Sequence, residues 1–400
     1  MKTLIILGAS AEACHIIRRV KELGIRTVVV DGNPNAPGID FADCFLVASC
    51  YHADEAIHVL HNAITKWYEH YDGVLCAAVD APHVAAAIRN AFGLPGMNVE
   101  IAWVSVDKYA QKRKLERSNI PIPMFLGCYG DCIPLGEWGI VKPCDSRGAR
   151  GVTRLLPSVD PAQAYAEAKA YSPTGRVMVE EWLDGPQINS ESILQDGKIL
   201  FTALSWRNYA RLEEFAPYVV EDGLDMIHND PALLARINVL LEDTCRALNW
   251  GQDYGMTVKG DIILHDGKLY ILELAARLSG GYYATYSIPM AFGVPFVDYA
   301  IQFALGKRTD KIDGIYKPVY LSQRYVFPEP SDIGKQIVSL PENADANFIA
   351  WHFRPGDVIR PVTSHPDRFG MAICTGATVT EARERAEQAV AEMKRGMALK

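Results

Sequence analysis

Strand and helix signals alternate through the first hundred residues, and this alternation limits the possible folds more than any other feature of the sequence. Leu4 to Leu7 is a short apolar run, an amphipathic stretch from Ala11 to Leu23 follows it, and Thr27 to Val30 is a second, β-branched run. The pattern continues in Cys44 to Val47, Ala53 to Glu69 and Val74 to Val79. Because parallel strands need a long connection, usually a helix, the alternation predicts an α/β region with a parallel sheet.

The first turn of this region does not fit dinucleotide binding. Gly8 to Ala13 reads GASAEA, whereas the Rossmann fingerprint G-x-G-x-x-G needs further glycines for pyrophosphate approach and helix packing. Asp31 ends the second run in the place of a ribose-binding acid. Without those glycines we expect no NAD site.

Composition and charge exclude several classes of protein. Of 400 residues, 49% are hydrophobic and 22% charged, as in an ordinary globular protein of roughly two or three domains. A net charge of −8 argues against a nucleic-acid partner, and no apolar run reaches the ~20 residues of a membrane-spanning helix. There is no signal-peptide pattern, and nine scattered cysteines without a Cys-x-x-Cys pair indicate free thiols. We expect a cytoplasmic protein with no membrane partner.

The character of the sequence changes near residue 105. Val106 to Arg117 is basic and helical, and Ile120 to Pro123 (IPIP) ends it in an extended segment. Short strand signals with hairpin turns at Asp196-Gly197 and Asp266-Gly267 follow, which predicts an α+β region. The last segment returns to strands and ends in a charged helix, Thr380 to Lys394. The strands expected in the middle are Gly139 to Lys142, Val177 to Leu183, Ile188 to Gln195 and Lys198 to Trp206. We predict three domains, 1–105, 106–305 and 306–400.

Two segments of the middle region have residues suited to a nucleotide. Lys142 leaves a predicted strand beside a loop, Asp145 to Val152, with two glycines and two arginines. Backbone N–H groups and cations of such a loop can cradle phosphates, although it is no Walker A loop; a solvated hairpin is the alternative. Val177 to Leu183 runs into two acids and could present polar groups to an adenine edge, or be a plain edge strand.

The strongest local signal is a hairpin with an acid on each arm. Asp261 and Glu273 flank Asp266-Gly267, and Arg277 follows. Facing carboxylates repel unless a cation lies between them, and hard oxygen ligands on neighbouring strands suit Mg²⁺; two exposed strand ends are the alternative. A two-residue turn in regular register puts the acids on opposite faces. A shared Mg²⁺ therefore requires a three-residue loop or an equivalent bulge.

Together and in this order, the motifs resemble those of the ATP-grasp superfamily, in its carboxylate–amine ligase and biotin-carboxylase-like branch. The resemblance implies an N-terminal α/β (pre-ATP-grasp) domain, an ATP-grasp domain with mixed antiparallel sheets, and a small C-terminal α+β lobe. It spans essentially the whole chain and rests on Asp107-Lys108, Val141 to Pro143, Glu180 to Gly185 (EEWLDG), Asp261, Glu273 to Gly281 (ELAARLSGG), Arg368 to Gly370 and Thr375 to Ala382.

The resemblance also implies cofactors and roles. ATP would be the nucleotide and Mg²⁺ the metal, with Mn²⁺ as a substitute. Lys108 and Lys142 would hold phosphates, Arg277 would steady the carboxylate or acyl-phosphate, and Lys142 and Arg277 would be the catalytic residues. The metal ligands would be Asp261 and Glu273. The remaining nucleotide contacts would come from Gly148, Gly151, Glu180, Glu181, Trp182, Leu183 and Gln187.

Two positions depart from the family pattern. Gln187 stands where members commonly place a ribose-binding Glu, and an amide binds a hydroxyl more weakly than a carboxylate does. Ala275 stands where members commonly have Asn. One metal ligand is therefore absent or comes from elsewhere.

We expect an ATP-dependent ligase. A small carboxylic acid, an amino acid in our interpretation, attacks the γ-phosphate to give an acyl-phosphate and ADP, and an amine then displaces phosphate. The alternatives are a carboxylase that acts through carboxyphosphate and a nucleotide-binding regulator without turnover. The partners would be the acid, the amine and a second copy of the chain in a homodimer. A predicted loop with Arg207, Tyr209 and Arg211 could meet the acid, but we interpret these three as surface residues.

Overall fold

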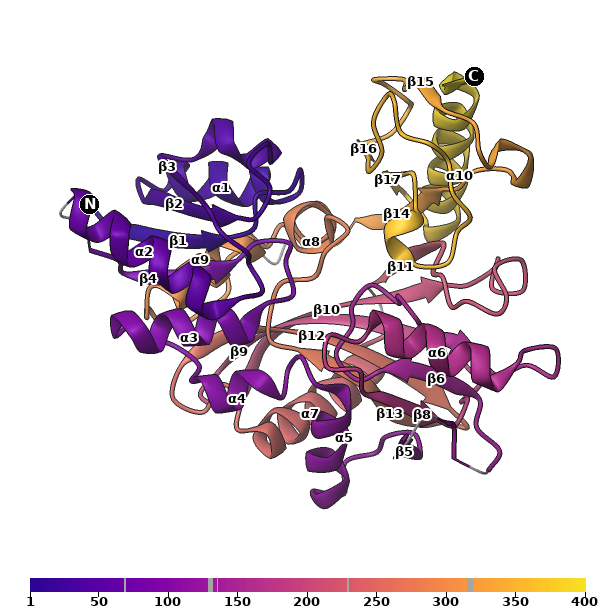
Figure 1. The fold of residues 1–400 in the computed structure, drawn as a ribbon, viewed down its shortest axis with the longest axis horizontal. Coiled ribbons are helices and arrows are strands. Elements are labelled where there is room, and N and C mark those ends of the chain that lie inside the picture. The colour runs from indigo at the N-terminus through magenta and orange to yellow at the C-terminus, as the bar shows by residue number, and fades with distance from the viewer. Residues whose placement is uncertain (68–69, 129–131, 135, 229, 315–318) are drawn as a thin grey trace.

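A parallel sheet lies at the N-terminal end of the chain, in a computed structural model that describes residues 1–400 apart from 68–69, 129–131, 135, 229 and 315–318 (Figure 1). Its strands lie in the order β3-β2-β1-β4, and each pairing is parallel. β1 is buried along its whole length, since its side chains alternate between two hydrophobic clusters, one on each face. The elements are β1 (Thr3–Leu7), α1 (Ala13–Glu22), β2 (Arg26–Asp31), β3 (Cys44–Val47), α2 (Ala53–Trp67), β4 (Gly73–Cys76) and α3 (Pro82–Phe92).

A second, antiparallel sheet of four strands has the order β5-β8-β6-β7. One helix, α6, covers it and packs small side chains and Tyr165 against the buried valines of β6 and β8. The elements are β5 (Phe125–Gly127), β6 (Ile140–Pro143), β7 (Thr153–Arg154), α6 (Pro161–Tyr171) and β8 (Val177–Glu180).

The largest sheet has eight strands in the order β13-β12-β9-β10-β11-β14-β17-β16, all antiparallel. Both predicted hairpins belong to it, and both residues of Asp196-Gly197 and of Asp266-Gly267 have positive φ, as type I′ turns require. The strands are β9 (Gln187–Gln195), β10 (Lys198–Asn208), β11 (Gly223–Ile227), β12 (Gly255–His265), β13 (Lys268–Ala275), β14 (Tyr320–Val326), β16 (Phe348–Trp351) and β17 (Gly370–Gly376).

Helices connect this sheet to the rest of the molecule. α7 (Pro231–Leu248) packs on β10, and α10 (Val379–Gly396) packs on β14 and β17. α9 (Phe296–Ala304) lies far from the N-terminus in sequence but against β4 and α1 in space (Figure 1). The remaining elements are η1 (Pro37–Phe41), α4 (Val99–Trp103), α5 (Lys108–Arg117), η2 (Tyr283–Ser287), α8 (Ile288–Phe292), η3 (Pro330–Asp332), β15 (Ile337–Ser339), η4 (His365–Asp367) and β18 (Ala398–Leu399).

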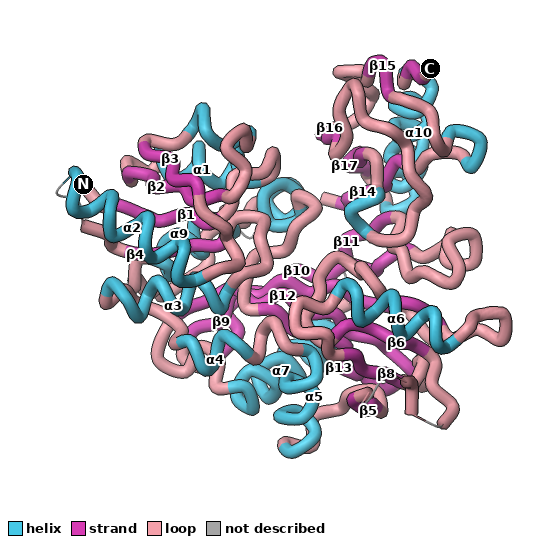
Figure 2. The backbone as a smooth tube through the Cα atoms, viewed as in Figure 1, coloured by secondary structure: helices cyan, strands magenta, loops and turns pink. Residues whose placement is uncertain are grey.

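The arrangement confirms the predicted fold class, a parallel α/β region followed by antiparallel sheets and a C-terminal α+β part. Much of the chain around α10 is loop (Figure 2). The large sheet includes strands on both sides of residue 305, so the division into 1–105, 106–305 and 306–400 stays a prediction. None of the helices among the described residues has the length and apolar character needed to cross a bilayer.

Candidate active site

A cavity of about 390 Å³ opens between the antiparallel four-stranded sheet (β5-β8-β6-β7) and the eight-stranded sheet. Its volume is within the usual range of small-molecule sites. The N-terminal region contributes Asp80 to its wall, and the C-terminal part contributes His365 and Arg368. All predicted site residues except Gly151 line it; these are Lys108, Lys142, Gly148, Glu180, Glu181, Trp182, Leu183, Gln187, Asp261, Glu273 and Arg277. Gly151 does not line this cavity and lies beside Pro143 and Tyr171, so its contact with the nucleotide stays a prediction.

A bulge in the β12–β13 hairpin brings the two predicted metal ligands face to face. The turn keeps only two residues, Asp266-Gly267, so a regular register would separate the acids. The register instead shifts by one residue next to Asp261, where Leu272 is the extra residue of β13, and Asp261 pairs directly with Glu273. Directly opposed side chains have Cβ atoms about 5 Å apart, which is close enough for one ion to contact both carboxylates.

Lys108 stands at the acid pair and at the loop after β6. Asp107 caps α5 by accepting the N–H of Ala110, which fixes Lys108 at the first position of the helix. The Lys108 ammonium lies 3.1 Å from Oε1 of Glu273 and donates to the carbonyl of Ser146 at 2.6 Å. It therefore lines the same cavity as Lys142, as the predicted phosphate roles of both lysines require.

Asp261 is held by two cations of the chain itself. Arg207 lies 2.9 Å from its Oδ1, and the Lys259 ammonium contacts its Oδ2. Burial alone would raise the pKa of the Asp261 carboxyl, but Lys259 and Arg207 outweigh burial and lower this pKa to about 2. The carboxylate is therefore ionised at any physiological pH.

Glu180 carries a buried ion-pair network rather than a free carboxylate. It is 2% exposed, and its two oxygens lie 2.7 Å from the Lys142 ammonium and 3.2 Å from that of Lys112. Burial is the main reason that the pKa of Lys112 falls to about 8, although Glu180 opposes this effect. Lys142 lines the cavity and Lys112 lies behind it, so only Lys142 is placed to reach a ligand.

The glycine loop after β6 contacts both the N-terminal region and the C-terminal part of the chain. The Arg147 guanidinium lies 3.6 Å from the centre of the Tyr51 ring in the N-terminal region. The carbonyl of Gly148 accepts the backbone N–H of His365 at 3.0 Å. The loop thereby closes one side of the cavity.

The residues after β8 continue along the cavity wall, as their predicted contacts with the nucleotide require. The side chain of Glu181 accepts the N–H of Met124 at 2.7 Å, and Trp182 donates from its indole to Asp184 at 2.8 Å. Gln187 follows at the first position of β9 and also lines the cavity.

Arg277 joins the cavity to the N-terminal region. Its guanidinium lies 3.2 Å from Asp80, and although burial opposes ionisation of that acid, Arg277 outweighs burial and lowers the pKa of Asp80. The next segment is fixed by Glu191, which accepts the N–H of Ser279 at 2.9 and 3.1 Å. Asp80 therefore holds the predicted carboxylate-binding guanidinium, and Glu191 fixes the backbone two residues further on.

The interpretation of Arg207 and Tyr209 as surface residues is wrong, because both line the cavity. β10 extends to Asn208, past the predicted end at Trp206, so Arg207 is an inward-facing strand residue that pairs with Leu224. Arg211 does not line the cavity and is bonded to its own loop at Glu214.

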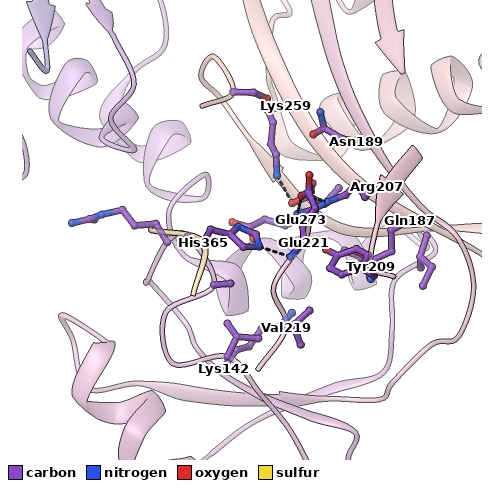
Figure 3. A pocket seen from close by; sticks show the side chains of 18 of the residues that line it. Lys142, Gln187, Asn189, Arg207, Tyr209, Val219, Glu221, Lys259, Glu273 and His365 are labelled. Atoms are coloured by element: carbon purple, nitrogen blue, oxygen red, sulfur yellow. Dashed lines mark hydrogen bonds and ion pairs between the residues drawn. The ribbon is translucent and has the colours of Figure 1, made fainter. Parts of the chain in front are cut away.

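Three residues at the same end of the cavity were not predicted as site residues: Glu221, Lys259 and His365. Arg207 donates to Glu221 at 2.7 Å, and Arg368 donates to the carbonyl of Glu221 at 3.0 Å. Burial, then Arg368 and Arg207, hold the pKa of His365 well below its usual range, so its imidazole is neutral. Figure 3 shows Arg207, Glu221, Lys259 and Glu273 converging in the cavity. No motif signals Glu221 or His365, because their contacts join distant segments of the chain.

The donor set fits a single hard divalent ion with nucleotide phosphates. Asp261 and Glu273 are opposed carboxylates, and Oδ1 of Asp261 lacks a hydrogen bond of good geometry. Across the described ranges, no three His, Cys, Asp or Glu side chains come together as metal ligands. Waters and phosphates would therefore complete the coordination shell.

Comparisons with known proteins agree with this geometry. The family model "L-amino acid ligase C-terminal domain 2" matches residues 342–395. The L-arginine-specific L-amino acid ligase of Bacillus subtilis is 28% identical over 212 residues, 48% of this chain and 48% of that protein. The carbamoyl phosphate synthase large chain of Thermomicrobium roseum is 22% identical over 317 residues, 74% of this chain and 28% of that protein. This chain thus spans less than half the length of these curated relatives.

Solved structures resemble the fold throughout, among them an L-amino acid ligase. The L-amino acid ligase from Bacillus licheniformis superposes with a TM-score of 0.78 at 17% identity, covering 100% of this chain and 98% of that chain. The predicted resemblance is confirmed: the chain has the ATP-grasp fold and is similar to the carboxylate–amine ligase and biotin-carboxylase-like branch of that superfamily.

Proposed function

We propose that the chain is an ATP-dependent carboxylate–amine ligase. It activates a small carboxylic acid, in our proposal an amino acid, as an acyl-phosphate, joins it to an amine, and releases ADP and phosphate. The observation that carries the proposal is the convergence in one cavity of Lys108, Lys142 and Arg277 with the opposed acids Asp261 and Glu273. Phosphoryl transfer needs mainly positioning and charge neutralisation, which these groups supply.

Each wall of the cavity has a role in this proposal. The segment from Glu181 to Leu183 takes the adenine, and Lys142, Lys108 and the loop around Gly148 hold the phosphates. Mg²⁺, held by Asp261 and Glu273, would offset the phosphate charge. Arg277 orients the acid so that one carboxylate oxygen faces the γ-phosphorus. That oxygen bonds to the γ-phosphorus as the bond to ADP breaks, which gives the acyl-phosphate. The amine nitrogen then bonds to the carbonyl carbon and loses a proton, and phosphate leaves with that oxygen.

A screen of acid and amine pairs tests the proposal. Amino acids are offered in pairs with MgATP, and ADP is measured by a coupled assay against ATP alone. We expect ADP release that needs both an acid and an amine. Release that needs bicarbonate instead would favour the carboxylase, and tight ATP binding without release under any condition would favour the regulator.

We further propose a cytoplasmic homodimer. Size-exclusion chromatography with light scattering tests the assembly, and a mass of one chain at micromolar concentration would contradict it.

A further inference from the structure

Lys259 lies on the same face of the hairpin as the acid pair. Asp261 pairs with Glu273, and the neighbouring cross-strand pair on that face is Lys259 with Ala275. Side chains two positions apart on a strand point to the same side of the sheet. On its other side, Lys259 faces Glu191 of β9. Lys259 therefore lies on the strand between β13 and β9, two residues before Asp261 and on the same face.

The ammonium of Lys259 is directed at the acid pair. It contacts Oδ2 of Asp261 and lines the cavity (Figure 3). Glu191, its other neighbour, has both oxygens on the backbone N–H of Ser279, at 2.9 and 3.1 Å. The side chain of Lys259 is only 17% exposed, so its charge stays close to the carboxylates.

The position opposite Lys259 offers nothing to a metal ion. The methyl group of Ala275 has no oxygen, and Mg²⁺ requires a near-octahedral shell of oxygen ligands. Sites of phosphoryl transfer use one or two divalent ions, and each ion needs ligands of its own or shared carboxylates. Asp261 and Glu273 are enough for one ion together with phosphates and waters. Lys259 supplies a further positive charge without a coordination shell.

We propose that the ammonium of Lys259 takes the place of a second divalent ion, so that the site binds one metal ion per nucleotide. The inference rests on the proposed function, because it assumes that nucleotide phosphates enter this cavity. The charge of Lys259 lies beside Asp261 and faces the same cavity as Lys108 and Lys142. The lysine thus helps to neutralise the phosphates, and it repels any second cation.

Counting metal ions on the nucleotide complex tests this role without any turnover. Native mass spectrometry of the full chain with saturating ADP and Mn²⁺ gives the number of Mn²⁺ ions per bound ADP, and samples without ADP correct for adventitious Mn²⁺. We expect one Mn²⁺ for the unaltered chain and for Ala275→Asn, in which the ammonium still excludes a second ion. The double variant Lys259→Ala/Ala275→Asn removes the ammonium, adds an amide oxygen, and should bind two.

Lys268→Ala is the matched control, because this exposed lysine begins the other arm of the same hairpin and does not line the cavity. It should bind one Mn²⁺. If the double variant does not fold, Lys259→Asn replaces it, with the same expected count of two. Two ions on the unaltered chain, or one ion on a folded double variant or on Lys259→Asn, would overturn the role of Lys259. Failure to form any ADP complex would instead refute the proposed function.

Discussion

Lys142 and Lys112 share the carboxylate of Glu180, but only Lys142 lines the cavity, so replacing each in turn separates phosphate binding from structure. In Lys142→Met, Glu180 keeps Lys112 at 3.2 Å, so the cost of about 3–5 kcal/mol for orphaning a buried charge is avoided. We expect a stability loss of about 1–2 kcal/mol, as for an ordinary substitution. Removing one fixed donor to developing charge costs about 10²–10³ in rate, about 2.7–4 kcal/mol.

The assay compares two methionine variants. ADP formation with the acid and amine found by the screen should fall at least a hundredfold in Lys142→Met. In Lys112→Met it should stay within about tenfold, because Lys142 remains 2.7 Å from Glu180. Chemical denaturation measures both stabilities. Equal losses of turnover in the two variants, or unchanged turnover in Lys142→Met, would refute the assignment of Lys142 to the phosphates.

Two further predictions concern the acids. Glu273→Gln should abolish ADP formation at physiological Mg²⁺, because a metal ligand and the partner of Lys108 are lost together. In Asp261→Asn, Mn²⁺ should partly restore ADP formation. Equal restoration of both variants by Mn²⁺ would contradict these roles. Burial raises the pKa of the Glu191 carboxyl from 4.5 to about 7, so its contribution to stability is full below pH 4.5 and is lost as pH rises through 7. The loss is about 3 kcal/mol, and Glu191→Gln should show a correspondingly smaller fall in its free energy of unfolding between pH 5 and 8. Identical slopes of the two stability curves would contradict this prediction.

Local sequence signals were sufficient wherever a local rule decides the structure. The apolar run of β1 and the β-branched run of β2 predicted a parallel sheet correctly, because strands that are buried on both faces have continuous apolar sequences. The Asp-Gly pairs gave type I′ hairpins, because both residues must adopt positive φ. For Asp261 and Glu273 to face each other, the sequence allowed two hairpin geometries, a longer loop or a bulge. The structure has the bulge, at Leu272, and no local rule chooses between the two.

The rest of the site depends on contacts between distant segments. Arg207 was placed in a loop because the predicted strand ended at Trp206, whereas β10 continues to Asn208 and pairs Arg207 with β11. Glu221 and Arg368 meet only because the C-terminal strands join the large sheet. Gly151 was predicted from its place in a glycine loop, but it lies beside Pro143 and does not line the cavity. Tertiary packing, rather than residue type, decides which side chains face the cavity.

The transfer of ¹⁸O from a labelled carboxylic acid to phosphate tests the central claim most directly. In an acyl-phosphate mechanism, the carboxylate oxygen that attacks the γ-phosphorus leaves with phosphate when the amine attacks the carbonyl carbon. With the acid and amine identified by the screen, we predict one ¹⁸O in each released phosphate, lost together with ADP formation in Lys142→Met. Phosphate without ¹⁸O during full turnover would contradict the account.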